Sequence, residues 1–313
     1  MAWLFGVSLD PFAATVHIIN TETRNRDAAT TGHLVRDACQ RLRRLQIRPA
    51  YLKVDSTLRG EVPAALHAVQ AAAAGSRIWL APSFPDQGRI VVDGELVVHG
   101  QPQCNVRALF EQDNIVVFDA ATDRDLFDIA SRALECRPRP LLAGSAGLAR
   151  QYASLLAQQD RRPTALPEPA TGPAVLLAGT IHQATLRQLS QWRYPRFSLI
   201  EPLDAIVSSI RQGADTLVEY DWSPAQTKAL EAFCRLLPSL RPRALMLTGG
   251  DTASLVCLLL EAVGIRLADE ILPGVPWGRL MGGASDNLVV VTKSGGFGPP
   301  DALETIRQSL PRL

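Results

Sequence analysis

Residues 244–253 read Ala-Leu-Met-Leu-Thr-Gly-Gly-Asp-Thr-Ala, an apolar run that meets a helical segment at a pair of glycines. The pattern predicts a buried strand over 244–247 and a helix over 252–263, with Asp251 as the N-cap. Two glycines let the backbone approach a ligand closely, and the free N–H groups at a helix start suit a phosphate. The alternative is that Asp251 merely caps the helix and the glycines merely turn the chain. These residues alone do not decide between the two.

The same alternation of apolar runs and helical stretches continues on both sides of this segment. In the C-terminal half the predicted strands cover 174–178, 196–200, 216–220, 244–247 and 288–291, and the helices cover 183–192, 203–212, 224–236, 252–263 and 301–310. In the N-terminal half the strands cover 15–20, 50–55, 77–81, 114–119 and 140–143, and the helices cover 27–45, 62–73, 123–135 and 146–156. Residues 91–98 predict a hairpin with Asp93-Gly94 as its turn. This order predicts an α/β fold.

The length and one polar segment predict how the fold is divided. A chain of 313 residues suits two domains of about 150 residues each. The segment 157–173 is polar, carries four prolines and has no apolar period, so residues 158–172 are predicted to form a linker. We therefore expect two domains, 1–157 and 173–313, each a mostly parallel sheet flanked by helices.

Two further strand ends in the C-terminal half carry polar residues. The loop Val291-Thr-Lys-Ser-Gly-Gly-Phe-Gly298 offers the charge of Lys293 and the backbone donors of Gly295 and Gly296, which suits a phosphate; a flexible exit loop is the alternative. After the strand 174–178, Thr180 can cap a helix or hydrogen-bond a phosphate or ribose, whereas His182 is expected to be a surface residue. Residues 273–280 predict a rigid loop that either walls an adenine pocket or simply connects two elements.

A cluster of charged and hydroxyl side chains follows the strand 50–55 in the N-terminal half. It contains two cations, one carboxylate and two hydroxyls, and residues 84–89 add a further arginine. The cluster consists of Lys53, Asp55, Ser56, Thr57, Arg59 and Arg89. Such a set suits a small polyhydroxy carboxylate, because the cations can bind the acid and the carboxylate can bind a hydroxyl. The alternative is a capped helix with an internal ion pair. Residues 20–24 add polar groups at another strand end.

The composition excludes several classes of protein. With 32 basic and 31 acidic residues the formal net charge is +1, which provides no field for a nucleic acid or an anionic membrane. No apolar run approaches the length of about 18 residues that a membrane span needs. Five scattered cysteines without a Cys-x-x-Cys pair predict reduced thiols in a cytoplasmic protein rather than a disulfide framework or zinc site.

Seven motifs together resemble the four-carbon acid sugar kinase family. They occur in the order KVDSTLRG (53–60), APSFPDQGR with a DG hairpin (81–94), AGSAGLA (143–149), AGT with a later glutamine (178–188), LTGGDTA (247–253), PGVPWG (273–278) and VTKSGGFG (291–298). Individually the motifs are weak, but the set covers nearly the whole chain from about residue 15. The resemblance implies an N-terminal sugar-binding domain and a C-terminal nucleotide-binding domain. It also implies transfer of a phosphoryl group from ATP, with Mg²⁺, to a hydroxyl of threonate, erythronate or a related acid.

The resemblance assigns residues to the two sites. The ATP site would be lined by Thr180, Gly249, Gly250, Asp251, Thr252, Gly295 and Gly296, with Lys293 beside them. The sugar acid would face Lys53, Asp55, Ser56, Thr57, Arg59 and Arg89. Phosphoryl transfer also requires a carboxylate near the acceptor hydroxyl. We predict Asp251 for this role because it adjoins the phosphate loop, with Asp55 as the second choice.

Three departures from the family pattern fall on the sugar side. No Asp-Asp-x-Thr-Gly-Ala motif is present, and Ser8-Leu-Asp-Pro11 is the nearest acidic stretch. Glu61 stands where the family has asparagine, and the stretch near 100–106 is shortened. These departures favour an alternative function, a catalytically inactive ATP-binding homologue with a sensory or regulatory role.

Two further expectations follow from motifs that the sequence lacks. A dinucleotide-dependent oxidoreductase is disfavoured, because no Gly-x-Gly-x-x-Gly opens a helix. The missing N-terminal motif is also expected to leave an open sheet edge, which a second copy of the chain could cover in a homodimer.

Overall fold

The computed structural model describes residues 2–5, 16–73, 75–110, 114–157, 171–179 and 182–310. The chain forms two compact units, one of Met1–Asn20 with Thr164–Leu313 and the other of Thr21–Pro163. We call the first the nine-stranded unit and the second the four-stranded unit, after their main sheets. The sequence division places residues 1–20 with the N-terminal domain, whereas their strands pair in the nine-stranded sheet. Most of the predicted linker, 158–170, lies outside the described residues.

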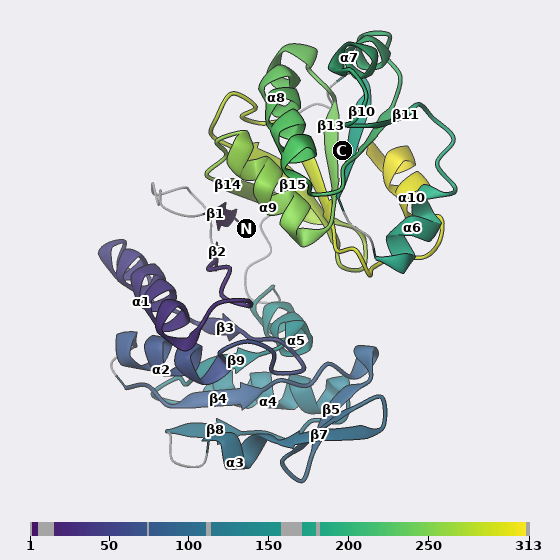
Figure 1. Ribbon diagram of the computed structural model, residues 1–313. Helices are drawn as coiled ribbons and strands as arrows, with labels where there is room; N and C mark the ends of the chain where they lie inside the picture. The colour runs from purple at the N-terminus through teal and green to yellow at the C-terminus, as the bar shows by residue number, and fades with distance from the viewer. Residues whose placement is uncertain are drawn as a thin grey trace. The chain divides into compact units, whose positions relative to one another are not determined.

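The nine-stranded sheet is parallel on one side and mixed on the other (Figure 1). Its parallel part has the order β11 (Arg196–Ser198), β12 (Thr216–Glu219), β10 (Ala174–Ala178), β13 (Ala244–Thr248) and β16 (Val289–Lys293). The sheet continues antiparallel through β15 (Val275–Met281), β14 (Gly264–Leu272) and β1 (Ala2–Phe5), and ends in β2 (His17–Asn20), which is parallel to β1. Among the described strands β2 is an edge.

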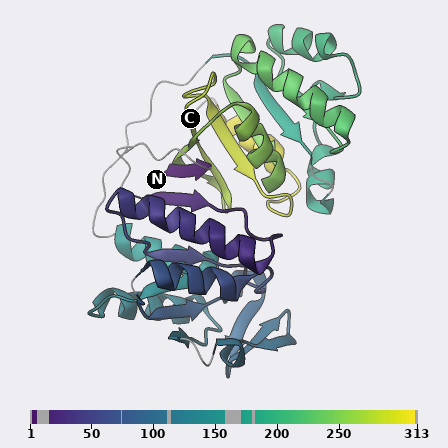
Figure 2. The ribbon, with the colours of Figure 1, turned by 60° about the vertical axis from the view of Figure 1, so that its left-hand side comes forward.

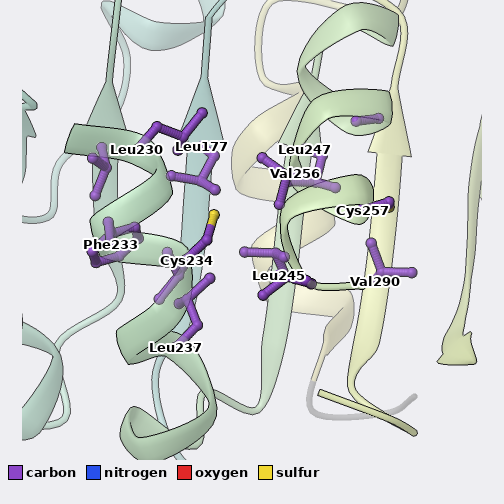
Figure 3. Packing of buried hydrophobic residues seen from close by; sticks show 14 of the residues in the cluster. Leu177, Leu230, Phe233, Cys234, Leu237, Leu245, Leu247, Val256, Cys257 and Val290 are labelled. Carbon is purple, nitrogen blue, oxygen red and sulfur yellow. The ribbon is translucent and has the colours of Figure 1, made fainter. Parts of the chain in front are cut away.

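Helices cover both faces of the parallel part, because its strands alternate buried side chains between the two faces. One layer contains α7 (Leu203–Arg211), α8 (Pro224–Leu240) and α9 (Gly250–Leu259). Figure 3 shows its core, in which Leu245 and Leu247 of β13 lie with Phe233 and Val256 of the helices. The intervening Met246 belongs to the opposite core, with α6 (Gln183–Leu189) and α10 (Ala302–Ser309).

The four-stranded unit is built around a fully parallel sheet of order β3 (Tyr51–Lys53), β9 (Leu141–Gly144), β4 (Ile78–Ala81) and β8 (Ile115–Val117). The helices α1 (Ala28–Arg44) and α2 (Val62–Ala72) lie side by side in one core (Figure 2). The helices α4 (Asp123–Glu135) and α5 (Ala146–Ala157) share the other core. A short η1 helix (Pro85–Gln87) leads into the antiparallel strands β5 (Arg89–Val92), β6 (Glu95–Val98) and β7 (Gln101–Asn105), which α3 (Val106–Phe110) follows.

The predicted fold class is confirmed, since each unit is a mostly parallel sheet flanked by helices. The predicted hairpin is present, with Val92 paired to Glu95 across the Asp93-Gly94 turn. The predicted loop over 273–280 is wrong: Pro273-Gly274 is the turn between β14 and β15, and the rest is strand. Pro276 is tolerated in this strand because it pairs beside a register shift, where the ladder is already irregular.

Two general features complete the description. No helix in the described part of the chain is long and apolar enough to cross a membrane. All five cysteines lie in that part, and each is a free thiol.

Candidate functional site

In the nine-stranded unit the chain leaves two neighbouring strand ends toward opposite faces of the sheet. Ala178 at the end of β10 lies beside Thr248 at the end of β13. The helix α6 follows β10 and contacts α10, whereas α9 follows β13 and contacts α8 on the other face (Figure 1). In open α/β sheets such a point is where ligands bind. The predicted glycine loops therefore lie at the expected edge of this sheet.

Helix α9 begins at Gly250, two residues earlier than expected. Gly249 is the N-cap, with a φ of 103° that favours glycine, and its N–H donates to the carbonyl oxygen of Lys293 (2.8 Å). Asp251 is therefore an exposed residue of the first turn, and its predicted N-cap position is wrong. Thr252 is buried and accepts a hydrogen bond from the hydroxyl of Tyr220 (3.2 Å). The hydrogen bond from Gly249 to Lys293 thus joins the two glycine loops through the backbone.

Lys293 is buried beneath the second glycine loop, with 3% of its surface exposed. Its Nζ donates to Thr185 Oγ1 (3.0 Å) and to the carbonyl oxygens of Ser294 (3.0 Å) and Phe297 (3.3 Å). The Thr185 hydroxyl in turn donates to the carbonyl oxygen of Gly295 (2.7 Å). Because its three protons are directed at protein oxygens, Lys293 holds the loop in shape and has no proton left for a direct hydrogen bond to a ligand.

Gln188 of α6 holds the remainder of the same loop. Its Nε2 lies within hydrogen-bond distance of the carbonyl oxygens of Phe297 (3.0 Å), Gly298 (3.0 Å) and Pro299 (2.9 Å). With Lys293 and Thr185, this amide draws the loop carbonyls inward. Neither Thr185 nor Gln188 is among the predicted site residues, although both lie in the helix that was predicted to follow the strand 174–178.

The buried ammonium predicts a pH-dependent contribution to stability. Burial lowers the pKa of Lys293 from 10.5 to about 8. Between these values the unfolded chain binds more protons than the folded one, so the stability contributed at this position rises with pH. We expect the wild type to gain stability relative to Lys293→Met between about pH 8 and 10, measured by urea unfolding. Lys228→Met, at an exposed position of α8, is the matched control. An unchanged difference between wild type and Lys293→Met would contradict the desolvation of this amine.

The start of α6 is only partly described. Thr180 lies outside the described residues. His182 is the N-cap of α6 and is exposed, and its Nδ1 accepts a hydrogen bond from the backbone N–H of Ala184 (3.2 Å). Its Nε2 lies beside Gly296, where a Cβ would be 3.2 Å away. The structure therefore brings α6 and the second glycine loop together, and His182 is a surface residue of the helix start, as expected.

In the four-stranded unit, Asp55 is the centre of a polar cluster at the end of β3. Its carboxylate accepts hydrogen bonds from the backbone N–H and hydroxyl of Thr57 (2.9 and 2.6 Å) and from Arg59 Nη2 (3.1 Å). Arg24 also donates to it. Burial raises the pKa of this carboxyl, but Thr57, Arg59 and Arg24 more than offset that effect and hold the pKa well below its usual range. Asp55 is therefore a weak base in this arrangement.

Two other cations of the cluster form no ion pair or hydrogen bond with a carboxylate among the described residues. Lys53 Nζ donates only to the carbonyl oxygen of Val54 (2.8 Å), and Arg89 Nη1 donates to the hydroxyl of Ser56 (3.1 Å). The Nε of Arg89 is buried without a partner. Burial lowers the pKa of Lys53. The nearby charge of Asp55 raises this pKa, and that of Arg24 lowers it further. A ligand carboxylate would satisfy these donors.

Arg24 is the residue of this cluster that the sequence prediction missed. It lies in the polar stretch 20–24, more than 30 positions before Asp55, and its backbone packs against Gly60. A Cβ on Gly60 would lie 2.9 Å from the carbonyl oxygen of Arg24, and the φ of Gly60 is 83°. The only sequence signal was a run of polar residues at a strand end.

Comparison with known proteins identifies two family domains in the chain. The chain matches the family models of a sugar-binding N-terminal domain over residues 5–107 and a nucleotide-binding C-terminal domain over 212–303, which together cover more than half of it. It is 28% identical to a D-threonate kinase of Bordetella bronchiseptica, across 95% of this chain and 86% of that protein. A D-threonate kinase of Salmonella typhimurium is 26% identical, across 93% and 87%. A 3-oxo-tetronate kinase of Cupriavidus necator is 28% identical, across 62% and 52%.

A solved structure has the same fold. A Salmonella typhimurium protein described as a putative tRNA synthase superposes with a TM-score of 0.81 at 19% identity, across 99% of this chain and 93% of that one. The two domains and their order define a kinase class in which a sugar-binding domain precedes a nucleotide-binding domain. The chain belongs to the four-carbon acid sugar kinase family. As a member of this family, the protein is a phosphotransferase with an alcohol group as acceptor.

Proposed function

We propose that the protein is an ATP-dependent kinase that phosphorylates a hydroxyl of a small four-carbon sugar acid such as threonate or erythronate. The observation that carries the proposal is a pair of cations in the four-stranded unit: Lys53 at the end of β3, and Arg89, which donates to Ser56. They lack a carboxylate partner among the described residues, in a domain that matches a sugar-binding family. Three of the relatives act, by name, on D-threonate and 3-oxo-tetronate, which are acids of this size.

The polar cluster of the four-stranded unit supplies complementary groups for such an acid. Lys53 and Arg89 would bind the carboxylate, and Ser56 would contact it or a neighbouring hydroxyl. Asp55 stays ionised and accepts hydrogen bonds, so it would orient Arg59, Thr57 and a substrate hydroxyl rather than remove a proton. Recognition here depends on fixed charges and donors.

The loops of the nine-stranded unit suit ATP. The N–H groups around Gly249 and Gly250 and the positive end of α9 would bind phosphate, together with Gly295 and Gly296. Thr180 and Thr252 would add hydroxyls, and Lys293 would offset charge. Mg²⁺ would bind together with the nucleotide, coordinated by its phosphates, and would neutralise part of their negative charge. The described residues contain no cluster of three His, Cys, Asp or Glu side chains that could hold a metal, which agrees with an ion held largely by the nucleotide.

Asp251 is the carboxylate that best suits the base. It is exposed on the first turn of α9, beside the loop predicted to bind phosphate. A carboxylate there could accept the proton of an attacking hydroxyl. Asp55 suits this role less well, because its hydrogen bonds stabilise the charged form and weaken it as a base.

A second candidate function is a catalytically inactive ATP-binding homologue with a sensory or regulatory role. It is favoured by the absence of an Asp-Asp-x-Thr-Gly-Ala motif from the sequence. The nearest acidic stretch, residues 8–11, lies outside the described residues. For either function we propose a cytoplasmic location, supported by the free thiols. A homodimer formed at the β2 edge stays a prediction.

The decisive experiment combines nucleotide binding with turnover. We expect calorimetry to show saturable binding of Mg·ATP, and a coupled assay to show ADP release with D-threonate, D-erythronate or 3-oxo-tetronate. ATP binding without ADP release for any acid would support the inactive homologue. An absence of ATP binding at millimolar nucleotide would overturn both functions.

A variant then tests the sugar side of the same proposal. Arg89→Gln should raise the KM for the acid by about 10-fold or more, because one charge-assisted hydrogen bond contributes about 1.5–3 kcal/mol. Its affinity for ATP should not change. Arg124→Gln, at an exposed position of α4, is the matched control. An unchanged KM in Arg89→Gln would remove this residue from the substrate site.

A further inference from the structure

An aromatic pair lies at the carboxyl end of β12, which is next to β10 and one strand removed from β13. Tyr220 is buried, whereas Trp222 keeps 40% of its surface exposed. Their ring centroids are 5.1 Å apart, with an angle of 50° between the planes. The indole Nε1 of Trp222 donates to the carbonyl oxygen of Gly179. One part of the indole is therefore fixed by protein, and another part faces solvent.

The backbone of Trp222 adopts an energetically unfavourable conformation. Its φ is 66°, in the left-handed region, where a bulky residue is a genuine outlier. Such conformations persist only where the surroundings hold them, and they are concentrated at ligand-binding sites. Here the hydrogen bond to Gly179 and the contact with Tyr220 hold the indole in place. An exposed tryptophan that served only to fill space would not require this conformation.

The aromatic pair connects the end of β10 with the start of α9. A side chain on Gly179 would collide with the ring of Tyr220, so the two are in close contact. Burial raises the pKa of Tyr220 to about 12, and its hydroxyl therefore stays protonated and donates to Thr252 Oγ1 (3.2 Å). β12 is separated from β13 by β10 alone, which is about 10 Å.

Two other tryptophans of the unit are unsuited to contact a nucleotide at this edge. Trp277, in the segment whose sequence suggested an adenine pocket, is 3% exposed and belongs to the core with α6 and α10. Trp192 follows the end of α6 and packs partly against the same core, away from the start of that helix. Trp222 is the remaining tryptophan in the described part of this unit whose side chain is placed.

We propose that Trp222, supported by Tyr220, stacks on the purine base of the bound nucleotide. The inference rests on the proposed function and adds to it the group that recognises the base. Stacking on an aromatic ring tolerates any base, but a purine presents the larger face. The phosphates would lie at the glycine loops, and the base would lie over the end of β12.

The test compares ATP with inorganic tripolyphosphate, which has phosphates but no base, by calorimetry on the full chain. Trp222→Asn removes the ring, and asparagine adopts positive φ readily, so the turn is kept. Trp222→Phe keeps an aromatic ring and also loses the bond to Gly179, which makes it the matched variant. We expect Trp222→Asn to weaken ATP binding by about 10-fold or more, with tripolyphosphate binding unchanged and Trp222→Phe within about 3-fold of wild type. Trp192→Phe is the control for loss of an indole elsewhere.

Three results would overturn the inference. ATP binding by Trp222→Asn that equals wild type would remove Trp222 from the site and leave the proposed kinase intact. Equal weakening of ATP and tripolyphosphate would mean that the ring acts on the loops and not on the base. An absence of ATP binding by the wild type would overturn the proposed function together with the stacking.

Discussion

Asp251→Asn is expected to lower turnover by about 10²- to 10⁴-fold, which is the range that one positioned acid–base group contributes. Affinity for Mg·ATP should stay within a few-fold, because in the proposed site the phosphates are bound by backbone N–H groups and their charge is offset by Lys293. The carboxylate is exposed on the first turn of α9, immediately after the two glycines. Asparagine keeps the size of the side chain but removes its negative charge and its ability to accept a proton. Steady-state ADP release and calorimetric ATP binding measure the two effects separately.

Asp204→Asn is the matched control for this change. Asp204 is likewise an exposed aspartate in the first turn of a helix of the same unit, α7. Loss of its favourable interaction with the helix dipole should cost about 0.3–1 kcal/mol of stability, as for Asp251, with no effect on turnover. Near-normal turnover in Asp251→Asn would disprove the assignment of the base. Equal losses in both variants would point to helix stability instead.

Local patterns predicted most elements of the fold, because burial and capping leave short-range signals. Helix α4 begins and ends as predicted, and its capping box of Thr122 and Asp125 is visible in the sequence. The hairpin β14–β15 was missed for a physical reason. Much of β14 is exposed, so it lacks an apolar alternation, and β15 contains a proline. Pairing between neighbouring strands, and not the sequence of either one, makes this hairpin.

The sequence predicted which strand ends form the candidate site, but it predicted few of the side-chain contacts within it. The glycine loops and the cluster around Asp55 could be found because parallel strands place their carboxyl ends on one edge. The direction of a side chain depends on distant partners: Gln188 and Phe297 are 109 positions apart, and Trp222 and Gly179 are 43 apart. The sequence therefore predicts that Lys293 faces a phosphate, whereas in the structure its ammonium is buried and donates to carbonyl oxygens of the loop.

A buried ionic network lies at the opposite edge of the nine-stranded sheet, near the amino ends of β10, β12 and β13. Asp215 is 9% exposed and accepts from the backbone N–H of Ala174 (2.8 Å), from both terminal nitrogens of Arg243 (2.7 and 2.9 Å) and from Arg307 Nη1 (3.0 Å). The Arg307 guanidinium also lies over the ring of Tyr194, 4.3 Å from its centroid. One carboxylate thus joins three strand starts to the last helix.

Asp215→Ala is expected to reduce the free energy of unfolding by about 3–5 kcal/mol, because it leaves the largely buried Arg243 guanidinium without its counter-charge and leaves Arg307 paired with Glu304 alone among the described residues. Burial raises the pKa of Asp215, but Arg243, Ala174 and Arg307 outweigh it and lower the pKa below 3.8. The contribution is therefore complete above that value and is lost on acidification. Urea unfolding near neutral pH measures the change. Glu231→Ala breaks the exposed pair with Arg235 on α8 and should cost only about 0.3–0.5 kcal/mol. Similar losses in the two variants would contradict a buried network, whereas a large loss confined to Asp215→Ala would show that this edge stabilises the sheet whose other edge forms the candidate nucleotide site.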